Sequence, residues 1–145
     1  MTTLSEFAEL ARGEQGLAVV ATVRADASIQ SSVVNLGVLE HPVSGEAVVG
    51  FVTYGKVKLG NLRARNQVNL AVRAGWQWAA VEGQAEIIGP DDPHPAVDAE
   101  RLRLLLREIF RAAGGTHDDW DEYDRVMVAD GRAAVLVTPQ RVYGS

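Results

Sequence analysis

The segment "GLAVVATVRADASIQSSVVNLGVL", residues 16–39, has the pattern of a β-hairpin. "RADAS", residues 24–28, supplies the turn between two runs that are rich in β-branched residues. Apolar side chains alternate along the first run, at Leu17, Val19, Ala21 and Val23. This period of two is typical of a strand. A hairpin this near the N-terminus predicts a mostly β domain.

Four further segments have strand character, and short helical segments separate them. The expected strands cover residues 47–53, 66–73, 76–89 and 132–144. Gly83 inside one of them indicates a bulge or a close backbone approach. The expected helices cover residues 3–12 and 56–64, a segment around 102–110 and a segment within 116–131.

Six strands with flanking helices predict one domain, residues 1–145, built as a small antiparallel β-barrel. Closure of the barrel removes the unpaired edges that so many short strands would leave. The helix around residues 102–110 has one apolar stripe, made by Leu102, Leu105, Leu106, Ile109 and Phe110. We expect this stripe to be covered, with a second subunit as one candidate.

Composition excludes several kinds of function. The 145 residues carry a net charge of −5, which argues against general nucleic-acid binding. There is no cysteine, so disulfides and thiolate metal sites are excluded. The three histidines lack metal-ligand spacing, and no Ser/His/Asp order indicates a nucleophile. With no apolar run of about 20 residues and no signal-peptide pattern, we expect a cytoplasmic protein without a membrane span.

One basic segment stands out in this acidic chain. No Asp or Glu lies between Lys56 and Arg73. Lys56 and Lys58 fall at the start of the expected short helix, just after a strand and Gly55. Because the first N–H groups of a helix lack internal partners, this arrangement favours a phosphate or a carboxylate. A solvated basic helix face is the alternative.

Two other segments carry side chains suited to a flat ligand. Trp76 and Trp78 are two apart on an expected strand, which places them on one face, where they either stack on a ring or belong to a core or interface. "QSSVVNL", residues 30–36, offers amide and hydroxyl groups at alternating positions. No residue is expected to act as a nucleophile, so an enzyme of this sequence would rely on a cofactor.

These landmarks, in this order, resemble the pyridoxamine 5′-phosphate oxidase-like split β-barrel superfamily. More narrowly, the chain resembles the actinobacterial branch that uses the deazaflavin coenzyme F-420. The similarity spans nearly the whole chain. It rests on the opening hairpin and on "KVKLGNL", "GWQWAAVEGQAEI", "DDWDEYDRVMVADGR" and "TPQRVYG". It implies a six-stranded split barrel that forms a homodimer with two cofactor sites in grooves at the subunit interface.

The resemblance also implies roles for particular residues. The lysines would hold the cofactor phosphate, with Asn61 nearby, and the strand around residues 30–34 would lie along the ring. The stretch 75–78 would flank the ring from the other side, and Arg132 and Tyr143 would approach from near the dimer interface. The full expected cofactor set is Gln30, Ser32, Val33, Val34, Thr53, Lys56, Lys58, Asn61, Gly75, Trp76, Gln77, Trp78, Arg132 and Tyr143.

The sequence therefore predicts an oxidoreductase that transfers a hydride from reduced coenzyme F-420 to a small hydrophobic or conjugated substrate. Two alternatives stay open. FMN could occupy the same lysines through its single phosphate, or the protein could bind the cofactor without turning it over. Gly60, at a position that is often basic in relatives, suggests a looser hold on the cofactor tail.

Overall fold

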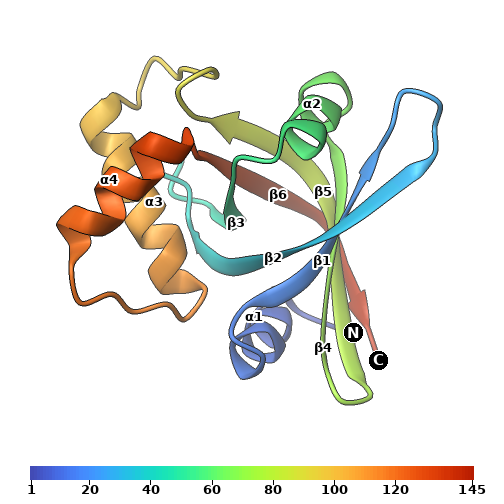
Figure 1. The fold of residues 1–145 in the computed structure, drawn as a ribbon. Coiled ribbons are helices and arrows are strands. Elements are labelled where there is room, and N and C mark those ends of the chain that lie inside the picture. Colours follow the sequence, from blue (N-terminus) through green and yellow to red (C-terminus); the bar gives the residue numbers. More distant parts are fainter.

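The computed structural model describes residues 1–145 (Figure 1). The chain forms four helices and six strands. In chain order they are α1 (Leu4–Gly13), β1 (Leu17–Val23), β2 (Ile29–Glu40), β3 (Ala47–Thr53), α2 (Lys56–Ala64), β4 (Gln67–Ala74), β5 (Gln77–Ile88), α3 (Ala99–Ala112), α4 (Trp120–Asp130) and β6 (Ala133–Gly144).

The six strands close into an antiparallel barrel in the order β1-β2-β3-β6-β5-β4. The predicted hairpin is confirmed: β1 pairs with β2 from Leu17 opposite Asn35 to Val23 opposite Ile29. β5 and β6 are long strands that pair from Ala79 opposite Gly144 to Ile88 opposite Ala134. Their length allows the sheet to coil round on itself. The sequence-based prediction of a six-stranded barrel with flanking helices is therefore confirmed.

A register shift between Glu82 and Gly83 marks the predicted bulge on β5. A Cβ at Gly83 would lie 2.1 Å from the carbonyl oxygen of Thr138 on β6. Only glycine permits this approach of the two backbones.

The barrel interior is filled by apolar residues that come from every strand. Val20, Leu36, Phe51, Leu70, Val81 and Val135 are all buried there. α2 lies at one end of the barrel and α1 near the opposite end (Figure 1). Phe7 of α1 and Leu62 of α2 join the same core.

α3 and α4 pack on the outside of the barrel and form a second core with it. The apolar stripe of α3, including Leu105 and Ile109, meets Val48 of β3 and Leu136 of β6, and Tyr123 and Met127 of α4 complete the cluster. The suggestion that a second subunit covers this stripe is wrong, because the chain's own barrel and α4 cover it.

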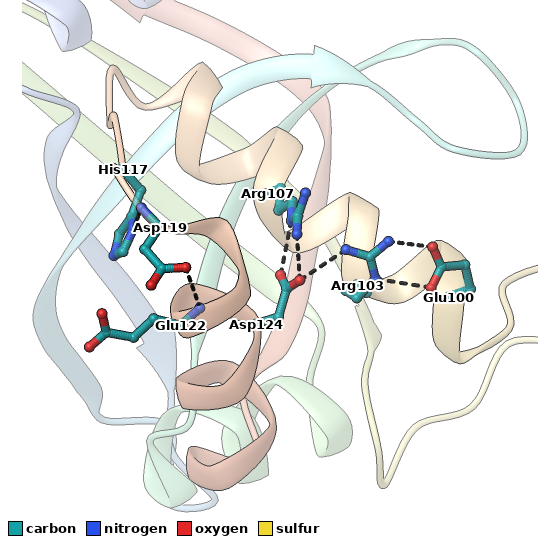
Figure 2. Close-up of polar contacts among 7 residues, drawn as sticks. All are labelled: Glu100, Arg103, Arg107, His117, Asp119, Glu122 and Asp124. Atoms are coloured by element: carbon teal, nitrogen blue, oxygen red, sulfur yellow. Dashed lines mark hydrogen bonds and ion pairs between the residues drawn. The ribbon is translucent and has the colours of Figure 1, made fainter.

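A network of ion pairs ties α3 to α4 (Figure 2). Asp124 of α4 accepts hydrogen bonds from Arg107 Nε and Arg103 Nη1, each at 2.9 Å. Arg103 also binds Glu100 one turn earlier. The Arg107 hydrogen bond, reinforced by Arg103, holds the pKa of Asp124 below its usual value. The two helices are therefore fixed together on the barrel.

The longest helix, α3, has 14 residues, several of them charged, and none of the four helices has the length and composition needed to cross a bilayer.

Candidate functional site

The passage from β3 to α2 leaves the start of α2 without a side-chain cap. Gly55 occupies the N-cap position in an extended conformation, and the first turn holds no acidic residue. Thr53 Oγ1 accepts a hydrogen bond from the Gly55 N–H at 3.2 Å, so the loop itself is fixed. The first N–H groups of α2 have no side-chain acceptor, which favours an anion beside them.

A groove of about 650 Å³ opens in front of this helix start. It is bounded by β2, the end of β3, the first turn of α2 and the residue before β6. Its walls are Val33, Val34, Asn35, Val52, Thr53, Tyr54, Gly55, Lys56, Lys58 and Arg132. The structure thus brings together a large part of the expected set, namely Val33, Val34, Thr53, Lys56, Lys58 and Arg132.

The two lysines supply positive charge that the protein itself does not neutralise. Neither forms an ion pair, and no Asp or Glu lines the groove. Lys58 is half-buried, and this burial lowers the pKa of its ammonium group. An anion that binds here would offset the cost of burying the charge.

Arg132 stands at the far side of the groove in a fixed position. Gly131 ends α4 in the left-handed conformation, with φ of 64°, and the Arg132 N–H donates to the Met127 carbonyl at 3.0 Å. The guanidinium carbon lies 4.3 Å from the centre of the Tyr54 ring. This cation–π contact holds the side chain against the groove wall.

Asn61 and Gln30 lie beneath α2. The Asn61 amide is buried and donates to Thr22 Oγ1 at 3.1 Å and to Gln30 Oε1 at 3.5 Å. Ser32 follows on the same inward-facing side of β2 as Gln30 and Val34. The Asn61 network pins α2 to the first hairpin, and therefore positions the lysines.

The remaining expected residues belong to the β4–β5 turn and its surroundings. Gly75, with φ of 63°, makes the turn. Trp76 is 97% exposed in that turn rather than on the strand, so the expected pairing of Trp76 with Trp78 on one strand face is wrong. Gln77 begins β5, and Trp78 packs edge-on against Tyr143, with 6.0 Å between ring centres.

Tyr143 is held in place by two further bonds. Its hydroxyl donates to Glu82 at 3.2 Å and accepts from Asn69 at 2.9 Å.

These two groups of residues lie at opposite ends of one barrel. α2 and its lysines are at one end, and the β4–β5 turn is at the other, beside the chain termini (Figure 1). The groove beside the lysines is therefore lined by none of residues 75–78 and not by Tyr143.

The outer surface of the barrel between them is unusually apolar. Val19 of β1 is 46% exposed and its cross-strand partner Val33 of β2 is 64% exposed. With Leu17, Ala71 and Trp78 they line a shallow depression of about 400 Å³. The alternating apolar residues at the start of β1 thus face outward, which is typical of a surface that meets another protein.

Four wall residues of the groove lie outside the cofactor set expected from the sequence, namely Asn35, Val52, Tyr54 and Gly55. Tyr54 follows a predicted strand and precedes the basic helix, so its position in the chain was the available signal. Asn35 follows Val33 at the next position on the same face of β2. No group of three His, Asp or Glu side chains has the arrangement needed to hold a metal ion.

Comparison with protein families gives a match over almost the whole chain. The model described as pyridoxamine 5′-phosphate oxidase matches residues 4–145.

Solved structures with the same fold include a conserved hypothetical protein, Rv2991, from Mycobacterium tuberculosis, with 17% identity and a TM-score of 0.70 over 99% of this chain and 84% of that one. An F-420 reductase has 18% identity and a TM-score of 0.58, with 88% of each chain covered. A pyridoxamine 5′-phosphate oxidase-related, FMN-binding protein from Nostoc punctiforme has 12% identity and a TM-score of 0.64, covering 99% of this chain and 86% of that one. At such identities these likenesses define the fold alone.

Proposed function

Because the chain belongs to the pyridoxamine 5′-phosphate oxidase family, we propose that its groove holds a flavin-type cofactor, and that this cofactor is the deazaflavin coenzyme F-420. The observation that carries the proposal is the pair Lys56 and Lys58, two unpaired positive charges at the uncapped start of α2. The groove beside them, at about 650 Å³, falls within the range of about 300–1,000 Å³ typical of small-molecule sites. The lysines hold the phosphate, and β2 around Val33 and Val34 lies along the ring.

The bound deazaflavin would supply a hydride to a small hydrophobic or conjugated acceptor. The chain's own part is to bind and orient. The lysines fix the phosphate end, the apolar strand excludes water from one side of the ring, and no side chain is needed as a nucleophile. Ser32 belongs to the strand that lies along the ring and has no separate chemical role in this proposal.

We further propose that the complete site needs two copies of the chain. Residues 75–78 and Tyr143 line no part of the lysine groove within one chain, and the β4–β5 turn lies at the opposite end of the barrel from α2 (Figure 1). A homodimer formed through the apolar outer face of β1, β2 and β4 would bring the turn of one subunit toward the groove of the other. Burial of Leu17, Val19 and Val33 would stabilise it.

FMN is the second candidate, because the lysines fit a single phosphate equally well and one structural neighbour is described as FMN-binding. The neighbour named as an F-420 reductase and the order of the sequence landmarks favour the deazaflavin. Absorbance separates the two directly, since a protein that retains FMN is yellow as purified.

The test of the enzymatic role is oxidation of the reduced deazaflavin by the purified protein with a panel of conjugated acceptors. We expect acceptor-dependent oxidation at a rate proportional to protein concentration, lost in a Lys56→Ala/Lys58→Ala double variant. Tight binding without turnover for any acceptor would identify a carrier instead. Arg12→Ala is the matched control, because it removes an exposed charge at the end of α1, away from the groove.

A further inference from the structure

A second cavity, which we call the side chamber, lies between the segment 89–98, α3 and α4. Its volume is about 630 Å³. Its apolar lining comes from Ile88, Pro90, Pro93, Val97, Leu102, Leu106, Met127 and Val128. The chamber is therefore large enough for a small organic molecule and offers it mainly hydrophobic contacts.

Most charged groups of the side chamber are already paired within the protein. Arg103 is shared between Glu100 and Asp124 (Figure 2). Asp98 caps α3 by accepting from the Arg101 N–H at 2.8 Å, so the start of this helix is not free for an anion. His94 Nδ1 accepts from the Ala96 N–H, and its Nε2 faces Glu86 at 3.8 Å.

Arg132 is the exception, because most of its hydrogen-bonding capacity is unused. Its Nε donates to Asp130 Oδ2 at 3.1 Å, whereas neither Nη atom has a protein acceptor. A guanidinium group carries five N–H donors in a planar fork suited to a carboxylate or carbonyl oxygen. Arg132 can therefore bind one more oxygen ligand without breaking an existing contact.

Arg132 also stands where three cavities meet. It lines the side chamber, the cofactor groove and a smaller apolar crevice of about 310 Å³ between them. Met127 lines both the side chamber and the crevice. A molecule in the side chamber thus reaches the wall of the groove at Arg132.

We propose that the side chamber and Arg132 form the binding site for the acceptor substrate, and that this substrate is a flat apolar molecule carrying one carboxylate or conjugated carbonyl group. The apolar body lies against Val97, Met127 and Val128, and the oxygen binds the free Nη atoms of Arg132. The role as a substrate site rests on the proposed function, whereas the binding of such a molecule does not.

The two lysines and Arg132 are proposed to bind different ligands because their surroundings differ. Lys56 and Lys58 line the groove beside the helix start, do not line the side chamber, and suit the phosphate. Arg132 alone among these cations borders an apolar chamber, so its ligand must pair an oxygen with hydrophobic surface.

Methionine methyl resonances provide a direct test with the full-length protein. The chain has two methionines, Met1 and Met127. Met1 is fully exposed, whereas Met127 lines the chamber. In protein labelled with 13C at the methionine methyl groups, titration with 2-naphthoate should shift the Met127 signal and leave Met1 unchanged. The neutral analogue 2-naphthalenemethanol should bind more weakly.

Three variants separate the chamber from other surfaces. Arg132→Gln should weaken 2-naphthoate binding about tenfold and leave 2-naphthalenemethanol nearly unaffected. Val128, at the mouth of the chamber, is 79% exposed, so Val128→Trp should fold and obstruct binding of both compounds at least fivefold. Val126 is 43% exposed on the same helix but lines none of these cavities, so Val126→Trp should bind as the wild type does.

An unmoved Met127 signal at millimolar 2-naphthoate would overturn the proposal, as would equal weakening by the two tryptophan variants. An Arg132→Gln protein that binds 2-naphthoate like the wild type would overturn the role of Arg132. This proposal and the cofactor proposal can fail separately. If the protein binds the deazaflavin but 2-naphthoate does not shift the Met127 signal, only the side-chamber proposal is overturned. If 2-naphthoate shifts the Met127 signal but neither the deazaflavin nor FMN binds, only the cofactor proposal is overturned.

Discussion

Lys58 offers the sharpest test of the phosphate site, because its charge is half-buried and has no partner in the protein. Replacing it with alanine removes one charge-assisted contact to the phosphate. Such a contact contributes about 1.5–3 kcal/mol, so the cofactor dissociation constant should rise roughly ten- to hundredfold. Lys58→Arg keeps the positive charge, so its cofactor dissociation constant should rise much less.

The lowered pKa of Lys58 adds a pH dependence with a definite sign. Below that pKa the ammonium is charged and attracts the phosphate, and above it the attraction is lost. Affinity should therefore fall as pH rises into the alkaline range, at lower pH than for a lysine with an unperturbed pKa. The last ionisation of a cofactor phosphate lies at about pH 6 or below, so a loss of affinity in the alkaline range comes from the protein's charge and not from the phosphate.

The assay is a fluorescence titration of cofactor at fixed ionic strength, at several pH values above 7. In Lys58→Arg the alkaline loss should shrink, because a guanidinium stays charged throughout. If Lys58→Ala binds the cofactor as tightly as the wild type at neutral pH, the phosphate does not sit at the start of α2.

Further substitutions probe the fold around the site. Asn61→Leu removes the buried amide that donates to Thr22 and Gln30 and leaves these two only their mutual hydrogen bond of 3.4 Å, so it should lower the free energy of unfolding by about 1–3 kcal/mol in urea titrations. Gly83→Ala forces a Cβ onto the Thr138 carbonyl and should cost at least as much as overpacking a core, about 1–3 kcal/mol, by the same measurement. Val19→Lys should convert a dimer to a folded monomer by light scattering, with an unchanged circular dichroism spectrum. Asp124→Asn should lower the thermal midpoint at pH 7, and the difference from wild type should vanish as pH falls through the depressed pKa of Asp124 and the wild type loses the same charge.

Periodicity predicted the barrel well because each strand carries its own signal. The hairpin, the bulge at Gly83 and the six strands follow from local alternation and turn residues. Which side of a strand faces the barrel interior, in contrast, depends on how the whole sheet closes. Leu17 and Val19 have the same pattern as core residues, yet they face outward, because the inner side of β1 is made by Ala18, Val20 and Thr22.

The basic site was predictable in its lysines but not in its geometry. Helical spacing places Lys58 and Asn61 on one side of α2, and Arg65 follows at the end of the helix. The structure shows that these residues divide between two surroundings: Lys58 lines the groove, whereas Asn61 bonds to Thr22 and Arg65 donates to the Val23 carbonyl at 2.9 Å, both on β1. The separation of Trp78 from the lysines depends on barrel closure, which local sequence does not encode.

A fluorescence titration with coenzyme F-420, and separately with FMN, at physiological salt shows whether the lysine groove binds a deazaflavin phosphate. We expect micromolar or tighter binding of coenzyme F-420, weaker binding of FMN, and loss of coenzyme binding in the Lys56→Ala/Lys58→Ala variant. Preference for FMN would contradict the choice of cofactor, and binding of neither would contradict the site itself.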